Sequence, residues 1–81
     1  MPDYILMDLL RAFVQGQNSE GEYPTVRECA KRFRTTQKRI LGIAEDFDGF
    51  MVNVGVQHGS GMYEYPNKGD YELEYESGGK G

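Results

Sequence analysis

The chain has few of the residues on which catalytic and disulfide-bonded proteins depend. Its 81 residues include one cysteine, one histidine and no tryptophan. Cys29 alone cannot form an intrachain disulfide, which fits a reducing compartment, and there is no second cysteine to share a metal ion. An active site usually combines an acid, a base and a nucleophile, and the sequence shows no such combination. We therefore expect a protein that is not an enzyme and that uses no metal or cofactor.

Long hydrophobic runs are missing as well. No apolar stretch approaches the roughly 20 residues that a membrane-spanning helix needs. The first residues lack the basic region and apolar stretch of a signal peptide, so we expect a cytoplasmic protein without a membrane partner. A chain of 81 residues allows one domain with a single modest core. We assign that domain to residues 1–76, and we expect the small and polar residues 77–81 to be a disordered tail.

Positive charge is scarce outside one segment. The chain has nine Lys or Arg residues against thirteen Asp or Glu, which gives a net charge of -4. Six of the nine basic residues lie between Pro24 and Ala44, where Glu28 is the only acidic residue, so this segment carries +5 and the remainder carries -9. A basic surface on a small acidic protein indicates a polyanionic partner.

A first helix is predicted near the N-terminus, because apolar residues recur there at helical spacing: Leu6, Leu9, Leu10 and Phe13. Asp3 can cap its start, and Gly16 stands where a C-terminal cap would lie, so the helix is expected to end near Gln15. Residues 17–22 are rich in turn formers and are predicted to be a loop. Tyr23 is a candidate for a one-residue strand.

Two further helices are predicted on either side of a tight turn. Thr25 and Glu28 form a T-x-x-E capping box, which starts the second helix. Thr36 is a good N-cap for the third helix, predicted over residues 36–47, whose apolar residues also follow the helical period. The turn between the two helices is centred on residues 34–35.

Beyond Gly49 the apolar period changes to two, which is typical of strands. Residues 50–56 alternate as one strand, residues 57–61 form a glycine-rich loop, and residues 62–65 return as its antiparallel partner. Tyrosine and leucine alternate with glutamate over residues 71–76, which makes this segment a possible third strand.

The order helix, helix, turn, helix, hairpin resembles the winged helix-turn-helix family, in particular its bacterial and phage DNA-binding members. The resemblance covers roughly residues 3–65 as a pattern. Ala30 stands at the family's small residue in the first motif helix, and the apolar core positions fall on Cys29, Phe33, Ile40 and Ile43. The resemblance implies an α+β fold, a winged helix in which a three-helix bundle containing the helix-turn-helix is followed by a β-hairpin wing.

The turn departs from the family pattern. Arg34 stands where the family usually has glycine, and Thr35 stands where it usually has a branched aliphatic residue. A left-handed Arg34 costs about 1 kcal/mol relative to glycine, and a phosphate contact can offset part of that strain. A turn of different geometry is the alternative.

In the family this resembles, the third helix is the recognition helix, which enters the major groove of double-stranded DNA. The candidates for base readout are Thr36, at the start of this helix, and four residues on its outward face: Gln37, Lys38, Leu41 and Gly42. Gln37 can bond an adenine edge, Lys38 can reach guanine or phosphate, and Leu41 can meet a thymine methyl. Gly42 makes sense if a side chain there would clash with DNA or with the wing; a poorly optimised surface position is the alternative.

Phosphate contacts are expected from the residues that flank this face: Arg27, Lys31, Arg34, Thr35 and Arg39. For any one of the basic residues, the alternative is a solvated charge on an amphipathic helix. In the wing, His58 and Ser60 are the candidate contacts, with Lys68 a weaker one.

These patterns predict a sequence-specific DNA-binding protein, a small transcriptional regulator or accessory factor of phage or plasmid type. Such a short reading surface needs a homodimer or cooperative oligomer for useful specificity. The alternative is a winged-helix interaction module, in which the acidic strand at residues 71–76 docks on a basic protein partner.

Overall fold

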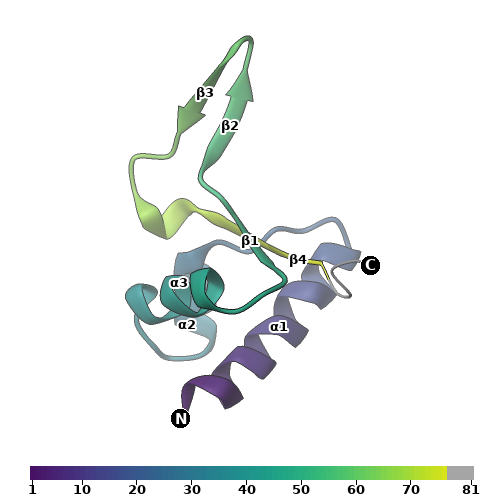
Figure 1. Cartoon of the computed structure of the whole chain (residues 1–81), viewed down its shortest axis with the longest axis vertical. Coiled ribbons are helices and arrows are strands. Elements are labelled where there is room, and N and C mark those ends of the chain that lie inside the picture. Colours follow the sequence, from purple (N-terminus) through teal and green to yellow (C-terminus); the bar gives the residue numbers. More distant parts are fainter. Residues whose placement is uncertain (77–81) are drawn as a thin grey trace.

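Three helices and four strands form a winged helix arrangement in the computed structural model, which describes residues 1–76 (Figure 1). In chain order the elements are α1 (Asp3–Ser19), α2 (Val26–Arg32), α3 (Gln37–Asp46), β1 (Phe50–Asn53), β2 (Gly55–His58), β3 (Gly61–Glu64), the 3-10 turn η1 (Lys68–Asp70) and β4 (Glu72–Tyr75). This confirms the predicted α+β fold class. The tail predicted at residues 77–81 lies outside the described residues.

The start of α1 differs from the prediction. The N-cap is Pro2, whose side chain forms no capping hydrogen bond, and Asp3 is the first helical residue. The Pro2 carbonyl accepts hydrogen bonds from the amides of Ile5 and Leu6, both at 3.1 Å. Asp3 therefore acts as an acidic residue in the first turn, where it favours the positive end of the helix dipole.

The predicted end of α1 is wrong by about one turn. The helix passes Gln15 and continues through Gly16, which lies exposed within it, to Ser19. A glycine inside a helix costs roughly 1 kcal/mol, so a tertiary contact must favour the extra turn. Asn18 supplies one, because its Oδ1 accepts a hydrogen bond from the amide of Tyr75 in β4 at 2.9 Å.

The helix-turn-helix follows its local signals. The Thr25 hydroxyl accepts from the Glu28 amide at 3.1 Å while the Glu28 carboxylate accepts from the Thr25 amide at 2.9 Å, which confirms the capping box. The Thr36 hydroxyl accepts from the Arg39 amide at 3.1 Å and caps α3. Arg34 has φ 53°, so the left-handed turn is present without glycine.

The strands pair differently from the predicted single hairpin. β2 pairs with β3, as expected for a wing, but β1 pairs with β4, with Val52 opposite Leu73. The predicted strand 50–56 is divided between β1 and β2. A Cβ on Gly55 would lie 2.1 Å from the Tyr63 carbonyl oxygen, so glycine permits a close backbone approach at the division. Only Gly59 and Ser60 remain in the wing loop.

β4 confirms the possible third strand and joins the sheet to the helices. The bridge between the helical segments and the sheet is formed by Thr25 with Glu72, so the assignment of a one-residue strand to Tyr23 is wrong. One of the hydrogen bonds beside this bridge lies on the N-terminal side of Thr25, where the Leu73 amide donates to the Pro24 carbonyl at 2.8 Å. Leu73 is fully buried and completes the core between the sheet and the three helices: Leu6, Leu10, Val14, Val26, Cys29, Ile40 and Ile43.

Between β3 and β4 the chain leaves the sheet over residues 65–71, a segment that we call the excursion. In Figure 1 the β2–β3 hairpin projects away from the helices, whereas the excursion turns back toward α2 and α3. The Tyr71 hydroxyl donates to the Glu64 carboxylate at 3.0 Å and closes the base of the excursion. This hydrogen bond, followed by burial, raises the pKa of Tyr71.

No helix in residues 1–76 is long and apolar enough to span a membrane.

Candidate nucleic-acid interface

The surface of α3 has an apolar side and a polar side. Ile40, Ile43 and Ala44 are buried in the core. Because successive residues of an α-helix are rotated by about 100°, Lys38 and Glu45 lie on the opposite side, and both are exposed. Thr36, at the start of the helix, is exposed as well, but its hydroxyl already accepts the capping hydrogen bond.

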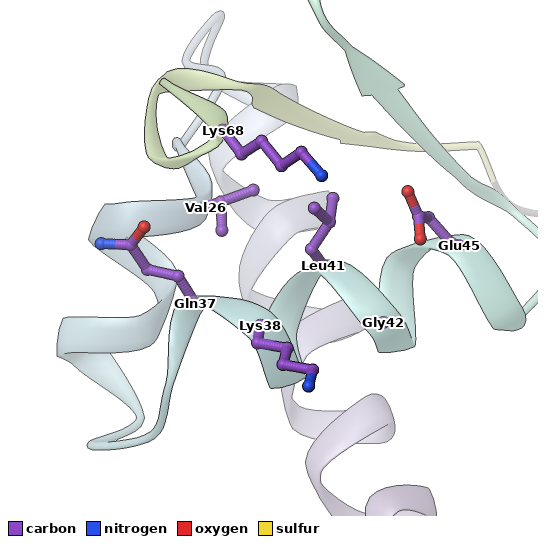
Figure 2. Close-up of a pocket in the computed structure, with 7 residues that line it drawn as sticks. All are labelled: Val26, Gln37, Lys38, Leu41, Gly42, Glu45 and Lys68. Atoms are coloured by element: carbon purple, nitrogen blue, oxygen red, sulfur yellow. The ribbon is translucent and has the colours of Figure 1, made fainter. Parts of the chain in front are cut away.

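An open groove of about 530 Å³ runs along this side of α3, bordered by the excursion. Its lining consists of Val26, Gln37, Lys38, Leu41, Gly42, Glu45 and Lys68. Figure 2 shows Lys68 reaching over Leu41 from the excursion while Lys38 lies on the other side of Leu41. The groove thus brings together four of the five residues predicted to read bases, and adds a lysine from a segment that is distant in sequence.

Leu41 is less free than the sequence suggested. It is half-buried and packs against the core cluster, at the edge of α3 that faces the excursion. Its exposed part can still offer an apolar contact to a ligand in the groove.

Gly42 has open space around it. A Cβ built on Gly42 would have no heavy atom within 4 Å among the atoms tested. The explanation that a side chain would clash with the wing is therefore wrong. A clash with DNA and a poorly optimised surface position are the explanations that remain.

Two of the predicted phosphate contacts are engaged within the protein. Arg27 forms an ion pair with Asp70 of η1, which lies 43 residues further along the chain. Arg39 forms an ion pair with Asp3 at 2.9 Å and also donates a hydrogen bond to the Met1 carbonyl. Their positive charges are partly compensated, so they contribute less to a polyanion site than the sequence implied.

The other predicted phosphate contacts remain available in the described part of the chain. Lys31 and Arg34 are exposed, and neither takes part in the ion pairs found among residues 1–76. Thr35 is half-buried, and its backbone amide donates to the Ala30 carbonyl at 2.9 Å. This hydrogen bond does not involve the Thr35 hydroxyl. Arg34 and Thr35 lie at the turn before α3, and Lys31 lies near the end of α2.

Arg32 is a basic residue to which sequence reasoning assigned no role. Its guanidinium lies 4.5 Å from the ring centroid of Phe13 and 5.9 Å from that of Phe33. The two rings meet edge to face with centroids 5.8 Å apart. Arg32 therefore covers the aromatic contact between α1 and the end of α2, and a cation–π interaction of this kind contributes about 0.5–1 kcal/mol at an exposed site.

The wing residues stand apart from this groove. His58 and Ser60 lie at the exposed end of the β2–β3 hairpin, which Figure 1 shows projecting from the body. The exposed side chains of the hairpin include the apolar Val56 and Met62 and the aromatic Tyr63. It contains no Lys or Arg between Gly55 and Glu64, so it offers no ammonium or guanidinium group to a phosphate backbone.

Cys29 belongs to the core rather than to a site. Its side chain is fully buried on α2, as its place on the apolar face predicted. Burial, which disfavours the thiolate, raises the pKa of Cys29 to about 12. The thiol is therefore neutral and unreactive at physiological pH.

The described residues contain no group of three His, Cys, Asp or Glu side chains placed to hold a metal ion. Lys68 is the residue of the groove to which the sequence pattern assigned too small a role, because its position depends on strand pairing rather than on a local pattern.

Comparisons with protein-family models, with curated proteins and with solved structures found no match for this chain.

Proposed function

We propose that the protein binds double-stranded DNA in a sequence-specific manner and acts as a small transcriptional regulator or accessory DNA-binding factor in the cytoplasm. The observation that carries the proposal is the groove along α3, in which polar and cationic side chains surround a half-buried leucine on the exposed side of the second motif helix. A helix of this kind in a helix-turn-helix presents its N-terminal residues to base edges in the major groove.

The groove residues have complementary chemistry for reading a duplex. Gln37 and Lys38, at the start of α3, supply an amide and an ammonium group for purine edges. Leu41 supplies an apolar surface for a thymine methyl. Gly42 leaves open space in which the edge of a base or a sugar can approach the helix backbone.

Phosphate binding is assigned first to three of the cations that take part in no ion pair found among residues 1–76, namely Lys31, Arg34 and Lys38. Arg39 ranks below them because it would have to leave Asp3. An exposed ion pair is worth at most about 1 kcal/mol, so Arg39 can exchange Asp3 for a phosphate of the duplex at little cost in free energy.

The groove reads few base pairs, so we further propose that the protein binds as a homodimer or a cooperative oligomer on repeated half-sites. No enzymatic activity and no cofactor enter the proposal.

The test begins with a fluorescent mixed-sequence duplex in low salt, followed by selection of bound sequences from a random duplex pool. We expect binding whose logarithmic affinity falls linearly with the logarithm of the salt concentration. Replacing Arg34 by Gln should lower the slope by about 1, because one phosphate contact is lost. Arg11→Gln is the matched control, since it removes one positive charge from α1, where Arg11 pairs with Asp8.

The same experiment separates DNA binding from the alternative, a protein-interaction module that uses the acidic side of β4. Glu72 and Glu74 are half-buried on that strand, which is bonded to Thr25 on one side and to β1 on the other. Such a module would leave a duplex unbound even in low salt, and Arg34→Gln would then change nothing. That result would rule out the DNA proposal.

A further inference from the structure

We infer that the excursion over residues 65–71 is a second DNA-contacting element, which holds the ammonium group of Lys68 beside α3 to bind a phosphate. In this arrangement Arg27 positions the excursion instead of touching DNA itself. The inference deepens the proposed function and rests on it.

The excursion is hydrogen-bonded at both of its flanks, to the start of α2 at one and to the strands at the other. The Val26 amide, at the start of α2, donates to the Tyr71 carbonyl at 2.8 Å. The Tyr71 hydroxyl in turn donates to Glu64 at 3.0 Å, and the Tyr65 amide donates to the Val54 carbonyl at 2.8 Å. The segment between these bonds is therefore fixed relative to α2 and to the hairpin.

The tip of the excursion packs against the groove. Gly69 is buried, and a Cβ on it would lie 2.7 Å from Oε1 of Gln37 and 2.8 Å from Nη2 of Arg27. These distances show that both side chains lie directly over the backbone of η1. The Arg27–Asp70 ion pair joins the same turn to α2.

This packing sets the place of Lys68. The residue is exposed, and it forms none of the ion pairs found among residues 1–76. Figure 2 shows its side chain crossing above Leu41, with Lys38 on the other side of that leucine. A phosphate at the Lys68 ammonium would lie over Leu41 on the excursion side of the groove, and Lys38 adds a second positive charge to the same lining, whereas the acidic Glu45 at its far end disfavours a phosphate there.

The excursion also supplies what the wing lacks. No Lys or Arg occurs between Gly55 and Glu64, so the projecting hairpin has no ammonium or guanidinium group with which to bind a phosphate. The excursion returns the chain from that hairpin to the body and brings Lys68 to the side of α3. The cation that the hairpin does not carry is thus provided next to the recognition surface.

The experiment compares Lys68→Gln, Lys68→Arg and the control Arg11→Gln with the unsubstituted chain, on a fluorescent duplex enriched from a random pool. We expect Lys68→Gln to lower the salt slope by about 1 and the affinity by about eightfold at 0.1 M salt. Lys68→Arg should keep the slope, and Arg11→Gln should leave it unchanged. An unchanged slope for Lys68→Gln overturns the inference.

Asp70→Asn tests the positioning role of Arg27. Removing an acidic group ordinarily strengthens binding to a polyanion, but here it should weaken binding, because the excursion loses its ion pair to α2. Circular dichroism checks that the variant is folded. Stronger binding by folded Asp70→Asn would show that Arg27 is itself a phosphate contact and would overturn this part.

The proposed function and the role of the excursion can be distinguished by the result that contradicts each of them. If the unsubstituted chain binds no duplex, the proposed function fails and this inference fails with it. If it binds and Arg34→Gln lowers the slope while Lys68→Gln does not, only the role of the excursion is wrong.

Discussion

The helix-turn-helix and the sheet of this protein are held together over very different distances in the sequence. In the helix-turn-helix, each cap joins residues only three positions apart, as in Thr25 with Glu28 and Thr36 with Arg39. In the sheet, Asn18 bonds to Tyr75 across 57 positions. Local contacts specify the shape of the motif, whereas the distant contacts decide what covers it and which side chains join its surface.

The largest expected effect tests whether the helices remain folded when their packing against the sheet is weakened. Leu73 of β4 is fully buried, so Leu73→Ala should lower the free energy of unfolding by about 2–5 kcal/mol. The matched control is Met62→Ala in the exposed hairpin, where the change should stay within about 0.5 kcal/mol. Chemical denaturation followed by circular dichroism measures both. A helical signal that survives unchanged while the sheet unfolds would show that the motif is independent of β4.

A second prediction examines the helical side of the core through pH. The buried Cys29 has a pKa raised to about 12, so the folded state keeps its proton after the unfolded chain has lost it. The stability from the neutral thiol is complete below the unfolded pKa of about 8.5 and falls by about 1.4 kcal/mol per pH unit above it. Denaturation of the unsubstituted chain should therefore show a steeper loss between pH 9 and pH 10 (both approximate) than Cys29→Ala. Equal slopes would mean that the thiol is not shielded from water.

The smallest effect concerns the exposed side of α3. Gly42→Ala should raise the free energy of unfolding by about 1 kcal/mol, because alanine favours a helix and meets no neighbouring atom. If the proposed interface is right, the same variant should bind the enriched duplex more weakly. Gly16→Ala in α1 is the control, since it has equally open surroundings and should gain stability without a change in binding. A Gly42→Ala variant that binds as well as the unsubstituted chain would favour the poorly optimised surface position.

These contrasts explain how far the sequence alone could lead. The two motif helices were predicted to within a residue or two at each end, because their caps are local and chemically distinctive. The end of α1 was not, since the local signal of Gly16 is outweighed by the bond from Asn18 to β4. The partner of β1 was also missed, because alternation of apolar residues identifies a strand without stating which strand it joins.

The candidate site shows the same division. Helical angles identified the outward side of α3, and the groove contains four of the five residues predicted to read bases. The partners of Arg27 and Arg39 lie 43 and 36 positions away, so no local pattern could reveal that their charges are compensated. The position of Lys68 in the groove depends on the long-range pairing of the strands, and the turn-forming sequence around Lys68 does not indicate that position.

The place of β4 has a consequence for how the chain acquires its structure. During synthesis from the N-terminus, α1 and the helix-turn-helix emerge before Leu73 and Tyr75, the residues that seal the core and bond to Asn18. Contacts of such long sequence separation form late, because the chain must first give up the entropy of a large loop. Until then the apolar faces of the helices are incompletely covered and open to association with other chains. The pairing of the strand that completes the core is thus a late step on which successful folding depends.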